Sequence, residues 1–173
     1  MTLQDLRSET LFERHAWKVF TGLSLIVVLF GVGDVLSGGL TFQTGEHVLL
    51  YSLSGTTWDE LNATARGPAN LIDYQVRAGG VYLLMTGLLS LSITLTALRR
   101  GDRWAWYAMW VWPLGIVLIE AQLLISVRTL GSGLPVPVIS GTIFIIVSVA
   151  TLALSSRKYL RKASPGTAQG VTT

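Results

Sequence analysis

Apolar residues gather in four long blocks along this chain, separated by two short polar stretches and one long one. The blocks run over residues 17–36, 78–98, 104–127 and 136–155. A helix rises about 1.5 Å per residue and the hydrocarbon core of a bilayer is about 30 Å thick, so about 20 apolar residues match one crossing. The pattern therefore predicts an all-α fold, a four-transmembrane-helix bundle that forms one membrane domain over residues 17–155.

The two ends of the chain are more polar than the blocks. Residues 1–16 are mixed in charge and have enough apolar positions on one side to predict a short surface helix. A cleaved signal peptide is the competing interpretation, but the polar stretch before the first block and the lack of an A-x-A site favour an uncleaved helix. Residues 156–173 are basic and then rich in Ser, Gly and Thr, which predicts a disordered cytoplasmic tail.

The longest loop, residues 37–75, contains a helix signal of its own. Thr57 and Glu60 have the spacing of a capping box, and Gly67-Pro68 follows as a stop signal. We expect a short helix between these signals that lies on the membrane surface, with Trp58 at the interface.

Lys and Arg are unevenly divided between the two sides of the predicted domain. Residues 1–18 hold three, the 99–103 turn three and the tail four, ten in all, against two in the 37–77 stretch and one in the last turn. Short cytoplasmic loops carry an excess of Lys and Arg, so this asymmetry predicts cytoplasmic N- and C-termini and an extracytoplasmic long loop. We expect the protein in the cell (plasma) membrane.

The turn after the second block combines positive charge with aromatic rings. Trp and Tyr settle at headgroup level, and Arg holds a short loop in the cytoplasm. We therefore predict interfacial anchors at this turn and in the long loop, namely Arg99, Arg100, Arg103, Trp104, Trp106, Tyr107 and Trp58.

The amino-acid composition agrees with a membrane location and excludes several kinds of functional site. Half of the 173 residues are hydrophobic, 13% are charged and none is cysteine. Without cysteine there is no disulfide, thiolate metal site or iron–sulfur cluster. The net charge of +3 comes from residues beside the spans. We therefore expect the lipid bilayer, and not nucleic acid, as the partner.

The polar residues at and inside the blocks come together in the outer half of the membrane when the spans run in the predicted direction. They are Asp34, Arg77, Glu120 and Gln122, with Arg128 beyond them. A charged group inside a membrane is costly and marks a functional site by default. We therefore predict a ligand or proton site formed by Glu120, Asp34, Gln122 and Arg77, with no catalytic residue.

Helical phase indicates which of these side chains face the bundle, because membrane helices pack through small residues. On the second span the small residues form the stripe Gly79, Thr86, Ser90 and Ala97. Arg77 falls on the opposite side, so we expect it to extend toward outer headgroups with Asp73 as its i,i+4 partner. A buried ion pair is the alternative.

Asp34 and Glu120 differ in phase. Asp34 shares a face with Gly31, which predicts that it points into the bundle. Glu120 falls on a different face from the small stripe that holds Gln122, although a kink at Pro113 alters that phase. A structural role is the alternative for Glu120, in which its carboxyl reaches water or a loop amide and orients the bundle.

No motif for a cofactor or a metal centre occurs in the chain. His15 and His47 fall on opposite sides of the predicted membrane, so they cannot hold one haem between them. Glu46 and His47 beside Asp34 or Asp73 give only a weak cation signal. P-loop, GxGxxG, GxSxG and HExxH patterns are absent from the sequence. We expect no cofactor and no metal.

Two stretches resemble small bacterial membrane proteins. They are GTTWDEL at 55–61 and RAGGVYLLMTGLLSLSITLTALRRGDRWAWYAMWVWP at 77–113. Together they resemble uncharacterised four-helix proteins of the broad DoxX-like kind, whose second span ends in an Arg-Gly-x-Arg-Trp-Ala-Trp turn. The resemblance implies a bacterial four-helix integral membrane protein and transfers no activity and no site residue.

Two classes of function fit this sequence. The first is a non-enzymatic multi-pass protein, either an accessory bundle or one that binds a lipid or an apolar ligand, with a homo-oligomer or another membrane protein as partner. The alternative is a small proton-coupled transporter or exporter that acts as a homo-oligomer through Glu120 and Asp34. A transporter needs its acid to face a water-accessible cavity, whereas an accessory bundle has that acid capped by neighbours. A membrane enzyme ranks third.

Overall fold

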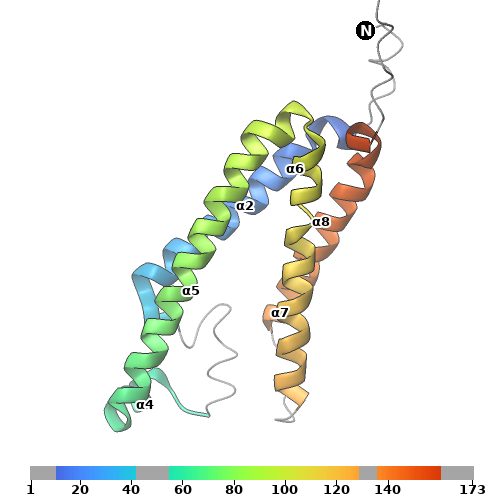
Figure 1. The fold of residues 1–173 in the computed structure, drawn as a ribbon. Helices are drawn as coiled ribbons and strands as arrows, with labels where there is room; N and C mark the ends of the chain where they lie inside the picture. The colour runs from blue at the N-terminus through green and yellow to red at the C-terminus, as the bar shows by residue number, and fades with distance from the viewer. Residues whose placement is uncertain (1–10, 42–54, 129–135, 161–173) are drawn as a thin grey trace, which may run out of the picture.

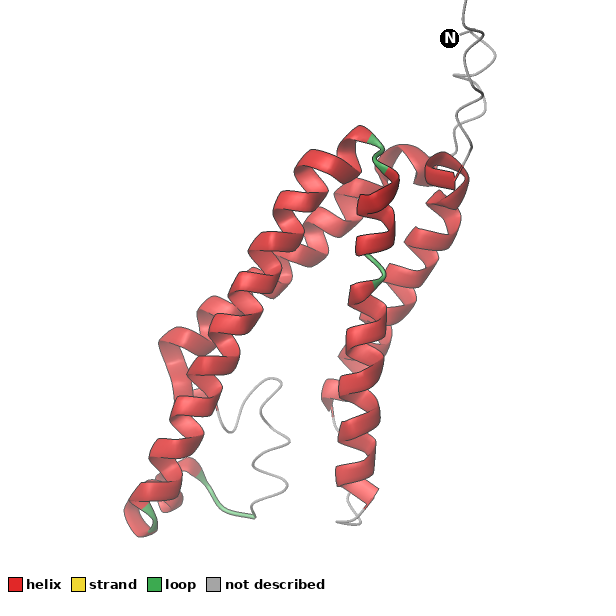
Figure 2. Ribbon diagram, in the orientation of Figure 1, coloured by secondary structure: helices red, strands yellow, loops and turns green. Residues whose placement is uncertain are grey.

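The computed structural model describes residues 11–41, 55–128 and 136–160, and these three ranges are helical apart from short connections (Figure 2). No strand occurs in them, which agrees with the predicted all-α class. The elements in chain order are α2 (Leu11–Ser37), the 3-10 turn η1 (Gly38–Thr41), α4 (Trp58–Thr64), α5 (Arg66–Ile93), the π-helical segment η3 (Thr94–Leu98), α6 (Arg103–Ala108), α7 (Val111–Arg128) and α8 (Val136–Leu160).

The described residues contain four helical stretches that are long and apolar enough to cross a membrane. They are Arg14–Leu40, Arg66–Leu98, Arg103–Gln122 and Ile139–Leu160. Each overlaps one of the four predicted blocks. The chain therefore has the fold of a helical membrane protein.

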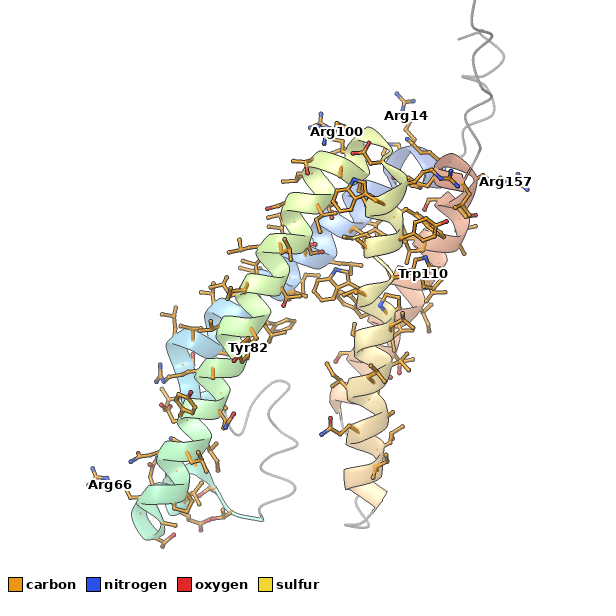
Figure 3. The ribbon with its side chains drawn as sticks, in the orientation of Figure 1. Arg14, Arg66, Tyr82, Arg100, Trp110 and Arg157 are labelled. Carbon is orange, nitrogen blue, oxygen red and sulfur yellow. The ribbon has the colours of Figure 1, made fainter. Side chains whose placement is uncertain are left out.

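The helices are arranged as two arms, and they do not form a closed bundle (Figure 1). In one arm α2 packs along α5, and in the other α7 packs along α8. The arms meet at the end that holds Arg14, Arg100 and Arg157, which we call the basic end (Figure 3). There α2 also contacts α8, and α6 contacts both η3 and α8. From this junction the arms diverge toward the end that holds Arg66, which we call the far end (Figure 3).

The hydrophobic core lies at the junction of the arms. Its buried residues are Phe20, Val27, Ala97, Leu98, Ala105, Trp106, Met109, Trp112, Leu152 and Tyr159. Trp106 Nε1 donates to the Leu152 carbonyl at 3.1 Å, and the Tyr159 hydroxyl donates to the Leu98 carbonyl at 3.0 Å. A buried ring with a polar end requires such a partner. The two bonds therefore join α6 and η3 to α8 across the junction.

The second span begins earlier than the predicted start at residue 78. Helix α5 starts at Arg66, directly after the single non-helical residue Ala65, whose φ is −142°. Pro68 stands in the first turn of α5, where the backbone N–H has no acceptor inside the helix, so proline is tolerated there. The short helix does end before Gly67-Pro68, at Thr64, but Gly67 and Pro68 belong to the first turn of the next helix and not to a loop.

The third span is broken, as the kink expected at Pro113 implies. Pro113 has no N–H to donate to the carbonyl of Met109, and its ring crowds that carbonyl. The chain passes from α6 to α7 through tighter bonds, from the Trp110 N–H to the Tyr107 carbonyl at 3.1 Å and from the Trp112 N–H to the Met109 carbonyl at 3.2 Å. This break changes the phase of every residue after it.

Two helices at the basic end extend beyond the predicted blocks. Helix α2 begins at Leu11, so residues 11–16 continue the first span and do not form a separate surface helix. Helix α8 continues to Leu160, into the segment predicted to be disordered. Adding residues to an existing helix needs no new nucleus, which favours such extensions. Residues 1–10 and 161–173 lie outside the described part, and the predictions made for them stay predictions.

The turn between the second and third spans is closed by glycine. Gly101 has a φ of +89°, a left-handed conformation that glycine adopts without strain. Its N–H donates to the Leu98 carbonyl and the Asp102 N–H to the Ala97 carbonyl, both at 3.0 Å. This is the Schellman pattern, which satisfies the last carbonyls of a helix. The span therefore ends at this turn, and α6 begins directly after Asp102.

The predicted capping box is present at the start of α4. The Glu60 N–H donates to the Thr57 hydroxyl at 3.2 Å, and the Thr57 N–H donates to the Glu60 carboxylate at 3.0 Å. The bond from the Thr57 N–H lowers the pKa of Glu60, because a carboxylate that accepts hydrogen bonds favours its charged form. The short helix in the long loop is confirmed, and its place at a membrane surface stays a prediction.

Candidate functional site

Asp34 points into the contact between α2 and α5. Its side chain is 6% exposed, and it lies on the buried face of α2 with Ser24, Val27 and Gly31. The facing residue of α5 is Gly80, where an added Cβ would lie 2.7 Å from the Asp34 Cβ. The predicted inward direction of Asp34 is therefore confirmed, and its immediate neighbour is the backbone of a packed helix.

Three glycines let α2 and α5 approach backbone to backbone. A Cβ at Gly31 would lie 2.8 Å from the Gly80 carbonyl oxygen, and one at Gly80 would lie 2.9 Å from the Gly31 carbonyl oxygen. One at Gly87 would lie 3.0 Å from the backbone nitrogen of Val28. Helices in lipid associate through close contacts between small residues. Lipid tails are as apolar as the side chains, so no hydrophobic effect drives the helices together.

The small stripe predicted for the second span is wrong at its first two positions. Gly79 has open space around it and Thr86 is exposed, whereas the neighbouring Gly80 and Gly87 are buried against α2. Assigning the packed face to Gly79 when it contains Gly80 turns that face by about 100° around the helix axis. The corrected face also brings Arg77 to the α2 side, one turn before Gly80.

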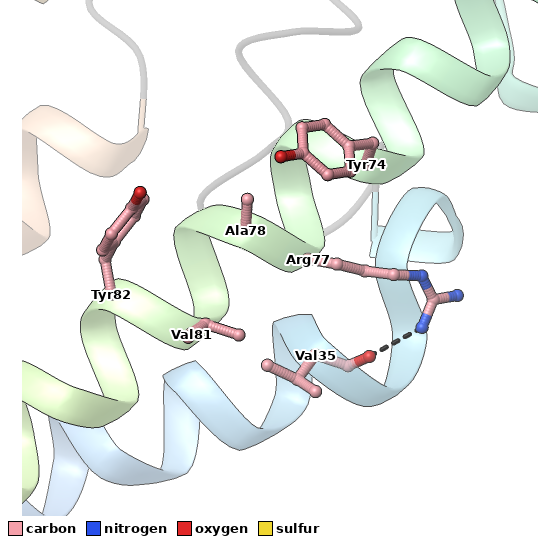
Figure 4. Close-up of a pocket in the computed structure, with 6 residues that line it drawn as sticks. All are labelled: Val35, Tyr74, Arg77, Ala78, Val81 and Tyr82. Atoms are coloured by element: carbon pink, nitrogen blue, oxygen red, sulfur yellow. Dashed lines mark hydrogen bonds between the residues drawn. The ribbon is translucent and has the colours of Figure 1, made fainter.

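Arg77 closes the far end of α2. Its Nη1 donates to the Val35 carbonyl at 2.6 Å (Figure 4). Its Nε donates to the Asp73 carboxylate at 2.8 Å. Asp73 in turn accepts from the Gly39 N–H at 2.7 Å. The i,i+4 partner of Arg77 is thus the predicted one. The last carbonyls of a helix carry partial negative charge and lack partners within the helix, so this guanidinium serves as a C-terminal cap.

A shallow groove lies beside this cap. Its lining is mostly apolar and consists of Val35, Tyr74, Arg77, Ala78, Val81 and Tyr82 (Figure 4). Tyr74 and Tyr82 lie on the side of α5 turned away from α2 (Figure 4). The groove holds one charged group, and that group is already bonded to Asp73 and Val35. It therefore offers surface for an apolar chain and no free charge for a polar ligand.

Glu120 packs against α8 in the other arm. A Cβ at Gly141 would lie 3.2 Å from the Glu120 carboxyl carbon, and the Thr142 hydroxyl donates to Glu120 Oε1 at 3.4 Å. The carboxyl thus occupies the space that the glycine leaves open, and its neighbours come from the helix it packs on. Gln122 is exposed on the same helix.

The four predicted site residues do not form one site. Asp34 and Arg77 belong to the arm of α2 and α5, whereas Glu120 and Gln122 belong to the arm of α7 and α8. The arms diverge over this part of the molecule (Figure 1). The predicted cavity around Glu120 and Asp34 is therefore not formed by the described residues of a single chain. The backbone of Arg128 ends α7, and its side chain lies outside the described part.

The predicted anchors divide into surface and core residues. Arg99, Arg100, Arg103, Trp104 and Tyr107 are exposed at the basic end. Trp106 is buried in the core and bonded to α8, so it joins helices and is unavailable as a surface anchor. Trp58 is partly buried, and its ring lies where a Cβ of Gly39 would be, which ties α4 to the end of α2.

A buried polar cluster at the junction was not predicted. Ser24 donates to Ser90 at 3.0 Å, and Trp112 Nε1 donates to the same Ser90 hydroxyl at 2.6 Å. Ser90 and Thr94 both lie within 3.9 Å of the Met109 sulfur. Small polar residues at helical spacing were visible in the sequence, but their pairing across three helices depends on the crossing of the spans.

No metal centre is assembled by the described residues. Within these ranges, no group of three or more His, Cys, Asp or Glu side chains is close enough to hold a metal ion. Glu46 and His47, the weak cation signal of the sequence, lie outside the described residues.

Comparisons with known proteins add no relative. No family model, no curated protein and no solved structure matches this chain. The DoxX-like resemblance therefore stays an expectation based on the two sequence stretches.

Proposed function

We propose that this chain is a non-enzymatic multi-pass protein of the cell membrane, an accessory bundle or one that binds a lipid or an apolar ligand. The proposal rests on the contacts made by the polar side chains of the predicted spans. Arg77 caps α2, Asp34 lies against Gly80, and Glu120 lies against Gly141. Each is engaged in helix packing on its own arm, and within the described residues they do not share a cavity of the kind that a proton-coupled transporter needs.

The orientation belongs to the same proposal. Both termini are cytoplasmic and the 37–75 loop is extracytoplasmic, on the ten-to-three distribution of Lys and Arg. In this orientation the basic end lies at the cytoplasmic leaflet, and α4 lies at the outer membrane surface with Trp58. The bacterial origin implied by the DoxX-like resemblance is part of the proposal.

The apolar flanks support a role in association. Large hydrophobic side chains on all four spans are uncovered by the rest of the chain, among them Leu29, Leu89, Leu118 and Ile146. Lipid tails satisfy such a surface, and so does a neighbouring membrane helix. A second copy of the chain or another membrane protein is the partner that we propose for this apolar surface.

Glu120 provides the experiment that separates this proposal from a proton-coupled transporter. Glu120→Gln keeps the shape and the acceptor for Thr142 while removing titration, so the purified variant should match the parent in thermal unfolding, ligand binding and pH response. Glu120→Leu should lower stability by about 1–3 kcal/mol, because the hydroxyl of Thr142 loses its acceptor and the site beside Gly141 is overfilled.

The transporter alternative predicts the opposite pattern for the same two variants. A protein that moves protons or cations through Glu120 should fold normally as Glu120→Gln and lose its pH-dependent flux in proteoliposomes. That result would remove the accessory-bundle proposal. Val117→Leu, a change at an exposed position of the same helix, is the matched control.

A further inference from the structure

Two cations from different elements approach one tryptophan ring at the basic end. Lys18 Nζ lies 5.7 Å from the ring centroid of Trp17, and the guanidinium carbon of Arg99 lies 5.2 Å from it. The two charges are therefore separated by no more than the sum of these distances. Cation–π attraction explains why each cation approaches the ring. It does not explain why two like charges gather there.

No carboxylate neutralises this pair among the described residues. Arg77 pairs with Asp73 at the other end of the molecule, and Arg100 pairs with Asp102 at 3.6 Å in the turn. Lys18 and Arg99 are both exposed, and each has the Trp17 ring as its described interaction. Like charges held together without a counter-charge repel each other, and an anion that touches both removes that repulsion.

Apolar surface continues from the two cations along both helices. Leu25 follows Lys18 by two turns on α2 and is 46% exposed, and Leu95 precedes Arg99 by about one turn and is 42% exposed. On α2, Gly22 lies one turn after Lys18, is exposed and has no atom within 4 Å of an added Cβ. The surface is thus charged at the end of the span and apolar beside it, which is the chemistry of a lipid molecule.

We propose that Lys18, Trp17 and Arg99 form a headgroup site for an anionic phospholipid. The anionic headgroup interacts with the Lys18 ammonium and with the Arg99 guanidinium, and a guanidinium binds phosphate oxygens with two parallel N–H bonds. The Trp17 ring lies at glycerol level, and the acyl chains follow Leu25 and Leu95. The site rests on the proposed orientation, because the basic end then faces the cytoplasmic leaflet, where anionic lipid attracts basic residues.

The test measures lipid binding to the purified full chain in neutral detergent. Native mass spectrometry compares phosphatidylglycerol with phosphatidylcholine of the same acyl chains. We expect selective binding of phosphatidylglycerol, and we expect the double variant Lys18→Gln/Arg99→Gln to weaken it by roughly tenfold or more, since each basic residue adds attraction. Lys18→Arg/Arg99→Lys keeps both charges and should retain the selectivity.

The matched control removes the same amount of charge from the same end. Arg100→Gln/Arg103→Gln leaves the Trp17 site intact and should change phosphatidylglycerol binding by less than about threefold. Equal losses in the two double variants would overturn the site in favour of a diffuse basic surface. Equal binding of the two lipids, or displacement of lipid by equimolar inorganic phosphate, would overturn the lipid assignment. Because binding is measured in detergent, such a failure leaves the proposed orientation to be tested separately by reporter fusions.

Discussion

Two adjacent glycines on α5 meet different surroundings. A Cβ at Gly80 would lie 2.8 Å from the backbone nitrogen of Val35, whereas a Cβ at Gly79 meets nothing within 4 Å. Backbone atoms of a packed helix cannot move aside as the end of a flexible side chain can. The closeness of α2 and α5 therefore depends on one of these glycines and not on the other.

Gly80→Ala should destabilise the protein by about 1–3 kcal/mol, because the added methyl group pushes α2 away from α5. Gly79→Ala should leave stability unchanged or raise it by up to about 1 kcal/mol, because alanine restricts the unfolded chain and favours helix. Unfolding in mixed detergent micelles measures both variants under the same conditions. Equal effects of the two changes would show that the α2–α5 contact is looser than described.

The start of helix α4 is stabilised by a charged group, the carboxylate of Glu60. With seven residues it is too short to be stable by helix propensity, so it relies on its cap and on contacts with α5. The Glu60 carboxylate accepts from the Thr57 backbone and from the hydroxyl of Thr56. Protonation of Glu60 weakens both bonds.

The cap should therefore loosen in acid. The pKa of Glu60 in the folded chain is below its ordinary value of 4.5, mainly because of the backbone hydrogen bond from Thr57. A lowered pKa contributes stability that is complete above the ordinary value and is lost as pH falls through the lowered one. The Thr57 amide resonance in an isotope-labelled sample should move toward its unfolded position over that acid range.

Glu60→Gln is the control for this titration. Glutamine accepts the same hydrogen bonds and does not titrate, so the Thr57 amide should become independent of pH between about 3 and 6. A shift that persists in the glutamine variant would mean that another group controls the start of α4.

The whole molecule joins two hairpins at the basic end, where Arg14, Arg100 and Arg157 lie (Figure 3). The core, the bonds of Trp106 and Tyr159 and the glycine turn at Gly101 all lie at this basic end. Among the described residues, the far-end contacts of Arg77 with α2 and of Glu120 with α8 lie within one arm. The stability of the assembly is therefore concentrated on the side that we propose to be cytoplasmic.

The proposed membrane topology of the whole chain can be tested with reporter fusions. Reporter fusions after Thr173 and within the 99–103 turn should give cytoplasmic signals, and a fusion at Gly55 should give an external one, because positive charge beside short loops retains them in the cytoplasm. An external signal from the fusion after Thr173 would overturn the proposed arrangement of the four spans.

A charge variant tests the cause of that topology. Replacing Arg99, Arg100 and Arg103 together with Gln should lower the fraction of correctly inserted chains, measured by the same reporters. Arg66→Gln, on the opposite side, is the control and should leave insertion unchanged or improve it. Equal insertion of the triple variant and the parent would mean that hydrophobic length alone orients the spans.

The sequence by itself determined the class of the protein and its local signals. Four apolar blocks predicted four span-forming helices, the spacing of Thr57 and Glu60 predicted a capped helix, and Pro113 predicted a break. These features follow from residues near each other in the chain. A helix period, a cap or a missing N–H acts over a few residues, so its effect is readable without the fold.

Only the tertiary structure decided which polar residues meet. Arg77 was expected on the side of its helix opposite the packed face, and it caps α2, because Gly80, not Gly79, faces that helix. Asp34 and Glu120 were expected around one cavity and belong to different arms. The crossing of helices and the divergence of the arms depend on backbone approach across the whole chain. A one-residue change of phase or a change of crossing angle leaves the hydrophobic pattern intact and moves every side-chain contact.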